Sequence, residues 1–213
     1  MPGSPVVPRL GDVTDASSPQ PSVPAGGVDH RPRFYVKQRI TMMVNRYEIR
    51  DANPDGSEGA VLAVAQQKRM AFKEQVTFYS DEARTTPVFS FRARQAMDLA
   101  AVYDVFDAAG TPIGYFQKDF AQSLLRSSFH LGGPGIDAYG QERSQLIAIL
   151  RRFIDFPFSF HFDFTDKNTG QTVMSSDRQF SLRDRYTVDV PDARLDFRLA
   201  AAMAVGLDAL LQR

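Results

Sequence analysis

The last part of the chain, from Leu195 to Leu211, is a helix-forming stretch with no polar face. No charged or polar side chain lies between Arg198 and Asp208, and apolar residues occupy both sides of the expected helix. A helix that is apolar all round is buried in a protein or in a membrane. The nine residues without charge are far fewer than the roughly 20 that span a bilayer. We therefore expect a helix over about residues 192–211, with Asp192 as its N-cap, enclosed by the rest of the chain.

The first 32 residues have a different composition from the rest. They hold seven of the thirteen prolines, and their hydrophobic residues are sparse and not periodic. Such a segment buries too little apolar surface to offset the entropy lost on ordering it. We predict a disordered tail over residues 1–32 and a single domain over residues 33–213.

Between this tail and the final helix, short apolar runs alternate with turn residues. Apolar and polar residues that alternate with a period of two predict strands. Strands are predicted at Phe34–Ile40, Tyr47–Asp51, Val61–Lys68, Lys73–Tyr79, Val88–Gln95, Ala101–Asp107, Ile113–Phe120, Gln122–Leu131, Phe158–Thr165, Thr172–Ser176 and Arg185–Val190. Gly132–Gly135 is interpreted as a loop, and Ser144–Phe153 fits either a strand or a short helix.

A weak repeat links these predicted strands into hairpins. Tyr47-x-Ile49-x-Asp51 is echoed by Tyr103-x-Val105-x-Asp107, and more loosely by Phe162-x-Phe164-x-Asp166. Each copy is a strand that runs into an acidic turn, and repeated hairpins build an antiparallel meander.

About eleven or twelve strands and one apolar helix predict an all-β fold. An eight-stranded barrel is filled by its own side chains, whereas a wider barrel has room for more. The alanines and glycine between Ala200 and Gly206 keep the helix slim. We therefore expect an antiparallel β-barrel of about twelve strands that encloses the C-terminal helix.

The composition excludes several classes of function. The 25 basic and 25 acidic side chains cancel, which disfavours nucleic acid as a partner. The absence of cysteine excludes disulfides, thiolate metal sites and cysteine nucleophiles. The sequence contains no nucleophile elbow, zinc-protease motif, phosphate-binding loop or dinucleotide fingerprint. We expect a cytoplasmic protein that is not an enzyme and needs no cofactor.

One stretch resembles the first half of a calcium-binding loop. Asp51, Asn53, Asp55 and Gly56 have the spacing of its first four key positions, but the twelfth position is Leu62 in place of glutamate. The same residues are common in tight hairpin turns. A turn is the favoured interpretation, and we predict no metal site.

Basic residues are the remaining candidates for a binding site. Lys68, Arg69 and Lys73 flank one turn, while Arg92 and Arg94 share the outer face of a predicted strand. A cluster of these side chains could bind a phosphate headgroup. The alternative is a solvated outer face, which the balance of charges favours.

The chain from Arg33 to the C-terminus resembles the Tubby C-terminal-like superfamily, and within it the LURP-one-related and phospholipid-scramblase-like proteins. The resemblance rests on the order of several short segments: Tyr35-x-Lys37-Gln38, Asn45-Arg46-Tyr47-x-Ile49-x-Asp51, Gln67-Lys68-Arg69, Tyr103-x-Val105-x-Asp107 and Tyr186-x-Val188-x-Val190-Pro191. It implies a twelve-stranded barrel around a hydrophobic C-terminal helix.

For function, the resemblance implies contact with lipids. Tubby domains bind phosphoinositide headgroups, and scramblase-like members are linked to calcium-dependent lipid movement. Scramblases have a cysteine-rich segment that is palmitoylated, and this chain lacks it. The acidic stretch that precedes their helix is reduced here to Ser181–Arg185. Both differences argue against scrambling and against permanent attachment to a membrane. We expect a non-enzymatic binding module that contacts anionic phospholipid headgroups, peripheral to a membrane, or a protein partner. The alternative is a scramblase-like phospholipid transporter.

Overall fold

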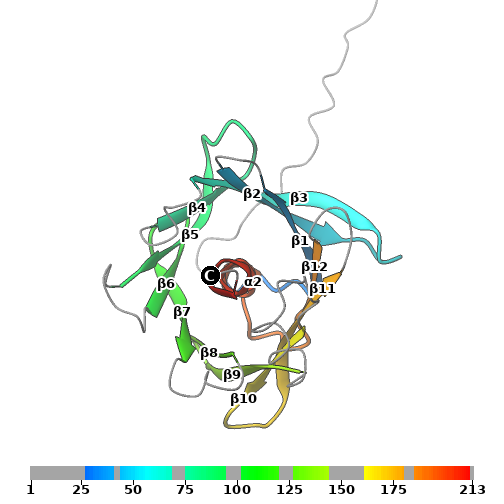
Figure 1. The fold of residues 1–213 in the computed structure, drawn as a ribbon, viewed down its shortest axis with the longest axis vertical. Helices are drawn as coiled ribbons and strands as arrows, with labels where there is room; N and C mark the ends of the chain where they lie inside the picture. The colour runs from blue at the N-terminus through cyan, green and yellow to red at the C-terminus, as the bar shows by residue number, and fades with distance from the viewer. Residues whose placement is uncertain are drawn as a thin grey trace, which may run out of the picture.

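A closed ring of strands surrounds a single helix in the computed structural model of the chain (Figure 1). The model describes residues 27–40, 44–68, 75–94, 102–119, 127–143, 161–179 and 185–211. The described residues form strands β1 (Arg33–Ile40), β2 (Val44–Ala52), β3 (Glu58–Lys68), β4 (Gln75–Tyr79), β5 (Pro87–Ala93), β6 (Val102–Asp107), β7 (Pro112–Asp119), β8 (Ser128–Gly133), β9 (Ile136–Glu142), β10 (His161–Asp166), β11 (Thr172–Gln179), β12 (Arg185–Asp189) and helix α2 (Phe197–Leu211).

Each strand pairs in antiparallel fashion with its neighbours in the chain. The ring closes where β1 pairs with β12, from Arg33 opposite Asp189 to Lys37 opposite Arg185. Closure removes the exposed edges that an open sheet presents to other chains. The predicted antiparallel β-barrel around a C-terminal helix is therefore confirmed.

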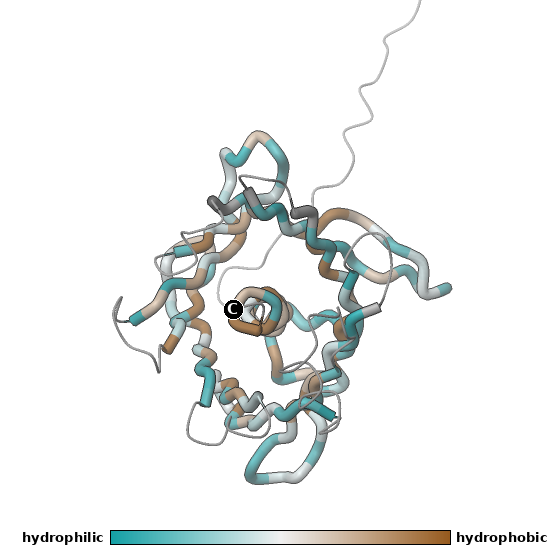
Figure 2. Tube along the Cα trace, viewed as in Figure 1, coloured by the Kyte–Doolittle hydropathy of each residue, from teal (hydrophilic) through white to brown (hydrophobic). Residues whose placement is uncertain are grey.

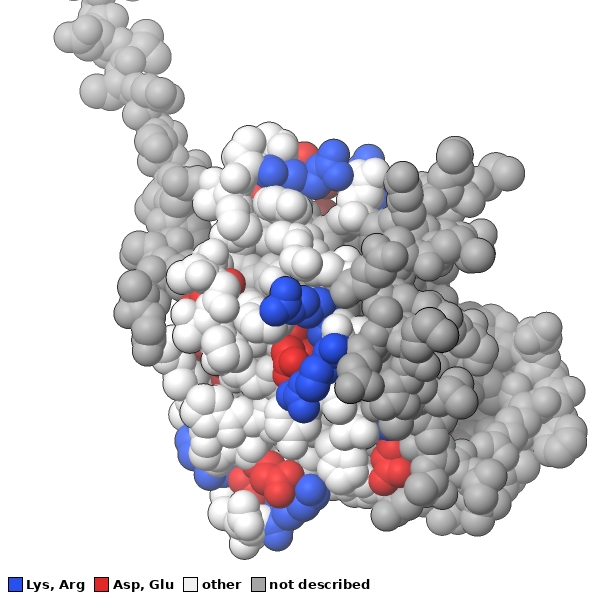
Figure 3. Space-filling model, turned by 90° about the vertical axis from the view of Figure 1, so that its left-hand side faces the viewer, with Lys and Arg blue, Asp and Glu red and all other residues white. Residues whose placement is uncertain are grey.

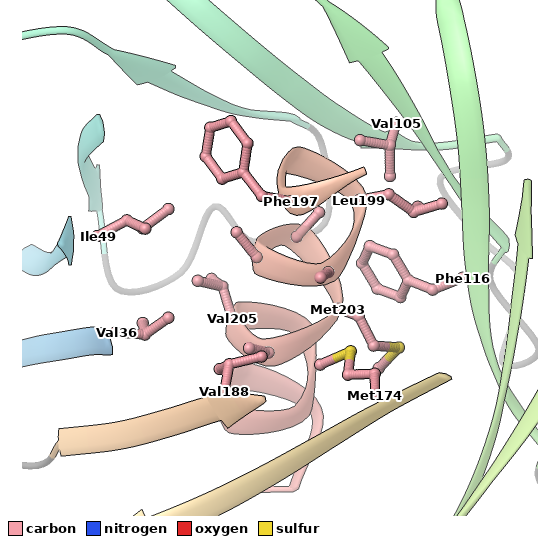
Figure 4. Close-up of a cluster of buried hydrophobic side chains, with 14 of the residues drawn as sticks. Val36, Ile49, Val105, Phe116, Met174, Val188, Phe197, Leu199, Met203 and Val205 are labelled. Atoms are coloured by element: carbon pink, nitrogen blue, oxygen red, sulfur yellow. The ribbon is translucent and has the colours of Figure 1, made fainter. Parts of the chain in front are cut away.

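The helix forms the centre of the hydrophobic core. Every residue of α2 from Phe197 to Asp208 is buried. Figure 4 shows Val36 and Ile49 on one side of the helix and Val105 and Phe116 on the other. In Figure 2 the helix is largely brown and white, inside strands that alternate between hydrophobic and hydrophilic residues. The interior that the strands enclose is therefore apolar and occupied.

Small residues let the helix and the wall approach closely. A Cβ atom on Gly206 would lie 2.6 Å from Cε2 of Phe116, and one on Gly114 would lie 2.5 Å from Cδ2 of Leu199. Gly114 also has a φ of +156°, which side chains other than glycine rarely adopt. The contact between α2 and β7 therefore depends on glycine from both elements.

Two of the three acidic residues of the repeat, Asp107 and Asp166, build hairpin turns. Oδ1 of Asp107 accepts hydrogen bonds from the backbone N–H groups of Ala109, at 2.9 Å, and Thr111, at 2.8 Å. Asp166 does the same for Asn168, at 2.8 Å, and Thr169, at 3.1 Å. These bonds satisfy backbone donors that the turn leaves without a ladder partner. In these two copies the aspartate of the repeat therefore stabilises a turn at the same mouth of the barrel.

The helix starts later than predicted. Its N-cap is Asp196, whose Oδ1 accepts a hydrogen bond from the Arg198 N–H at 2.9 Å. Asp192, the predicted N-cap, instead accepts from the Arg194 N–H at 2.9 Å in a preceding turn. The prediction was wrong because β12 lies in the wall and α2 inside the ring, so residues 190–196 must first cross between them.

One strand of the barrel was not predicted. Strand β9 follows directly after a turn at Pro134 and Gly135, and the preceding glycines, expected to lie in a loop, complete β8. The inward face of β9 carries Ala138, Gly140 and Glu142 beside Ile136. Gly140 is needed there because the Phe164 ring occupies the space of a side chain. The inner face of this strand therefore lacks the large apolar residues that pattern analysis detects. The ambiguous segment Ser144–Phe153 lies outside the described residues.

Residues 27–32, assigned from the sequence to the tail, contact the mouth of the barrel. The Asp29 carbonyl accepts from the Phe197 N–H at 2.8 Å, and the Asp29 N–H donates to Oδ2 of Asp196 at 3.1 Å. The Pro32 carbonyl accepts from the Val190 N–H at 2.8 Å. These bonds satisfy backbone donors at the start of α2 and the end of β12. Residues 1–26 lie outside the described residues.

Leu199→Asp should prevent folding or strongly lower the melting temperature. Leu199 is 2% exposed, and an aspartate there would place an unpaired charge in the apolar interior. The free energy of unfolding should fall by more than the about 2–5 kcal/mol that a buried leucine-to-alanine change costs. Thermal unfolding followed by circular dichroism measures it. Val28→Asp is the control, because Val28 is 53% exposed. A soluble Leu199→Asp variant with an unchanged melting temperature would show that α2 is not enclosed.

Two truncations should separate the contribution of residues 27–32 to stability from that of residues 1–26. Removal of residues 1–26 should change stability by less than about 0.5 kcal/mol. Removal of residues 1–32 also deletes the acceptors of the Phe197 and Val190 N–H groups, and should lower the melting temperature by roughly 4–10 °C. Equal melting temperatures for the two truncations would contradict a structural role for residues 27–32.

Candidate functional site

Two predicted basic residues lie on the outer surface of the barrel. Strand β5 alternates, so Phe89 and Phe91 point inward with no exposed surface, while Arg92 and Arg94 point outward. Figure 3 shows basic side chains, with acidic ones between them, on the side of the barrel formed by β4 to β7. We use the term arginine face for Arg92, Arg94, Asp104, Phe106 and Tyr115 on and beside these strands.

Arg94 is held by a carboxylate of the neighbouring strand. Its Nε donates to Oδ2 of Asp104 at 3.0 Å, and Nη2 donates to Oδ1 at 2.5 Å. Its guanidinium carbon also lies 5.9 Å from the centre of the Tyr115 ring. The hydrogen bond with Asp104 raises the pKa of Arg94, which therefore stays charged. Asp104 compensates this charge, so Arg94 contributes little net positive charge to the face.

Arg92 is in a different situation. It lies directly opposite Asp104 in the β5–β6 ladder, but Arg94 occupies that carboxylate. The guanidinium carbon of Arg92 lies 4.7 Å from the centre of the Phe106 ring, a cation–π distance. Among the described residues, no carboxylate forms an ion pair with Arg92. Arg92 is thus an exposed positive charge, supported by an aromatic ring, that the described carboxylates do not neutralise.

The structure brings together only part of the predicted basic set. Lys68 ends β3, but its side chain lies outside the described part of the chain, as do Arg69 and Lys73. The sequence prediction missed Asp104, Phe106 and Tyr115. The alternation of β6 carries a signal for the first two, because inward-facing Tyr103 and Val105 place Asp104 and Phe106 on the outer face.

The residues that resemble a calcium loop serve separate structural purposes. Oδ1 of Asp55 accepts from the Ser57 N–H at 2.9 Å and from its hydroxyl at 2.6 Å, and these bonds lower the pKa of Asp55. Asn53 donates to Oγ of Ser57 at 2.9 Å. The carboxylate of Asp51 pairs with Arg31 at 2.8 Å. In the ranges that the model describes, no three histidine or carboxylate side chains are placed to hold a metal ion.

A pocket of about 260 Å³ opens at the mouth of the barrel where α2 begins. We call it the mouth pocket. It lies between Gly27 and Val28, the turns that join β6 to β7 and β8 to β9, and the first residues of α2. Its apolar lining consists of Val28, Pro112, Ile113, Pro134, Ile136, Leu195 and Leu199.

A buried ion pair forms one side of the mouth pocket. Nε and Nη2 of Arg198 donate to the two carboxylate oxygens of Asp196, at 2.9 and 2.6 Å, and both side chains are less than one tenth exposed. The hydrogen bond with Asp196 raises the pKa of Arg198, and the charges of Asp196, Asp107 and Asp29 raise it further. The two charges compensate each other, and Asp196 also favours the helix N-terminus electrostatically.

A second polar group anchors the other end of the helix. The carboxylate of Asp208, 1% exposed, accepts hydrogen bonds from the hydroxyls of Tyr47, at 3.3 Å, and Tyr186. Burial and the neighbouring Asp208 charge raise the pKa of Tyr47, so its hydroxyl remains a donor. These bonds help to satisfy a carboxylate that is buried in the apolar interior.

Comparison with known proteins identifies the family of this chain. None of the described helices is both long and apolar enough to cross a bilayer. The search of curated proteins finds no match to the chain. The model of the LURP-one-related family matches residues 61–208, which include the whole arginine face and most of the lining of the mouth pocket. The chain therefore belongs to the LURP-one-related family.

Proposed function

We propose that the protein is a non-enzymatic binding module whose arginine face contacts anionic phospholipid headgroups. The observation that carries this proposal is Arg92, exposed on Phe106 and without a carboxylate partner among the described residues. A guanidinium group matches the geometry of a phosphate and can donate two parallel hydrogen bonds to it. The neighbouring Arg94–Asp104 pair adds no net charge that would repel or attract the ligand.

The expected binding is reversible and peripheral. A basic residue near an anionic membrane contributes about 1 kcal/mol, so one arginine alone gives weak attachment. Lys68, Arg69 and Lys73 would strengthen the contact if their side chains face the same membrane surface. The proposed place of action is the cytoplasmic side of a membrane, and the sequence contains no motif that favours an enzymatic role.

A protein partner is the second candidate. The stacked pairs Arg92–Phe106 and Arg94–Tyr115 combine the residue types that are enriched at protein interfaces. A partner with an exposed carboxylate or phosphate would meet the same Arg92 guanidinium.

Arg92→Glu should reduce binding to anionic vesicles by roughly 30-fold. The change removes one attractive charge and adds one repulsive charge, about 2 kcal/mol in total. Co-flotation with phosphatidylcholine, phosphatidylserine and phosphoinositide vesicles, with and without calcium, measures the bound fraction. Arg46→Glu is the matched control, because Arg46 is an exposed arginine on β2 that forms no ion pair with the described residues.

The outcomes separate the candidate functions. Equal losses in the two variants would mean that net charge alone, and not the arginine face, drives binding. Absence of binding to every vesicle would contradict the lipid proposal and favour the protein partner, to be sought by pull-down. A strict requirement for calcium would favour a scramblase-like activity.

A further inference from the structure

We propose that the mouth pocket binds an uncharged, mainly apolar small molecule, about the size of a substituted benzene or a short alkyl chain. None of the residues of the arginine face lines this pocket. The proposal is therefore independent of the function proposed above, and it concerns a different ligand at a different place on the barrel.

The chemistry of the lining points to an apolar ligand. Ile113 of β7 is partly exposed, and Val28 and Pro112 add exposed apolar surface to the same lining. Figure 4 shows Leu199 pointing from the helix toward the wall, where Val105 of β6 and Phe116 of β7 lie nearby. A ligand that covers this surface would remove apolar area from water, which is favourable by about 25 cal/mol per Å².

The rim of the pocket leaves apolar surface in water. Val28 is 53% exposed and is the single large hydrophobic side chain classed as exposed among the described residues. It lies in the segment packed on the mouth, and so on the rim of the pocket and not on an unrelated loop. Val28 thus extends the apolar lining of the pocket to its rim, and a concave, mostly apolar lining with a few polar groups is typical of a small-molecule site.

The charged groups around the pocket exclude an anionic ligand. Arg198 is paired with Asp196, and its Nη2 also reaches the Gly27 carbonyl at 3.4 Å. Arg194 is paired with Asp192, at 2.6 Å, and with Asp166, at 3.0 Å. An anion would have to break one of these pairs and would also face the Asp107 carboxylate, whereas a neutral ligand leaves the pairs intact.

The size of the pocket sets the size of the ligand. An apolar cavity of about 150 Å³ in a protein interior can bind benzene or xenon. The mouth pocket, at about 260 Å³, has room for a benzene ring with an additional short substituent. It is too small for a whole phospholipid, so the ligand class is a small apolar molecule.

Toluene is the probe, and methyl NMR of the full-length chain is the measurement. We expect saturable shifts in the methyl signals of Val28, Ile113 and Leu199, and a higher melting temperature in the presence of toluene. Benzoate, which has a similar size and a negative charge, should cause neither change. Signals of methyl groups in the far half of the helix, such as Leu207, serve as internal references.

A pocket-filling variant tests the location. Ile113→Phe should weaken toluene binding at least tenfold by occupying the pocket. Leu210→Phe, at the other end of α2, is the matched control and should bind toluene like the unchanged protein. Absence of shifts at the pocket methyls, shifts that are equal throughout the core, or equal binding of benzoate would each overturn the proposal.

Discussion

The need to enclose an apolar helix governs this structure. Helix α2 is buried around its whole circumference, so it cannot lie on a sheet or between two layers and needs a surface that surrounds it. A twelve-stranded barrel is wide enough, provided that the helix is slim. The alanines of α2 and the close approach of Gly206 to Phe116 meet this condition. The width of the barrel and the composition of the helix are thus two sides of one constraint.

The two ends of the helix make polar contacts, whereas its middle is packed only by apolar side chains. Asp196 and Arg198 pair at the first turn, and Asp208 meets two tyrosine hydroxyls of the wall near the last. The hydrophobic effect is not directional, so the burial of apolar area alone does not distinguish one depth of the helix from another. The close contacts at Gly206 and Gly114, together with these two directional polar groups, fix the depth and rotation of α2 within the barrel.

Most of the fold follows from the sequence, because alternation along strands and the apolar final stretch are strong local signals. The error at Asp192 has a physical cause: several aspartates near a helix start are all plausible caps, and only the path from wall to axis selects Asp196. Strand β9 was missed because a ring from another strand fills the space above Gly140, which makes a buried position look polar or flexible. The arginine face was predicted only in part. Arg92 and Arg94 both lie within reach of the Asp104 carboxylate, and the sequence does not tell which of them forms the ion pair. In the structure Asp104 pairs with Arg94, diagonally across the ladder, and not with Arg92, which lies directly opposite.

The order of elements along the chain has a consequence for biosynthesis. The helix that fills the barrel follows all of its strands, and the seam between β1 and β12 joins segments about 150 residues apart in sequence. During translation the inner faces of the strands are made before the residues that cover them. The barrel can therefore neither close nor become stable before β12 and α2 have been synthesised, and the nascent chain must keep its apolar surfaces from aggregating until then. Proteins with this architecture should depend on chaperones more than their size suggests.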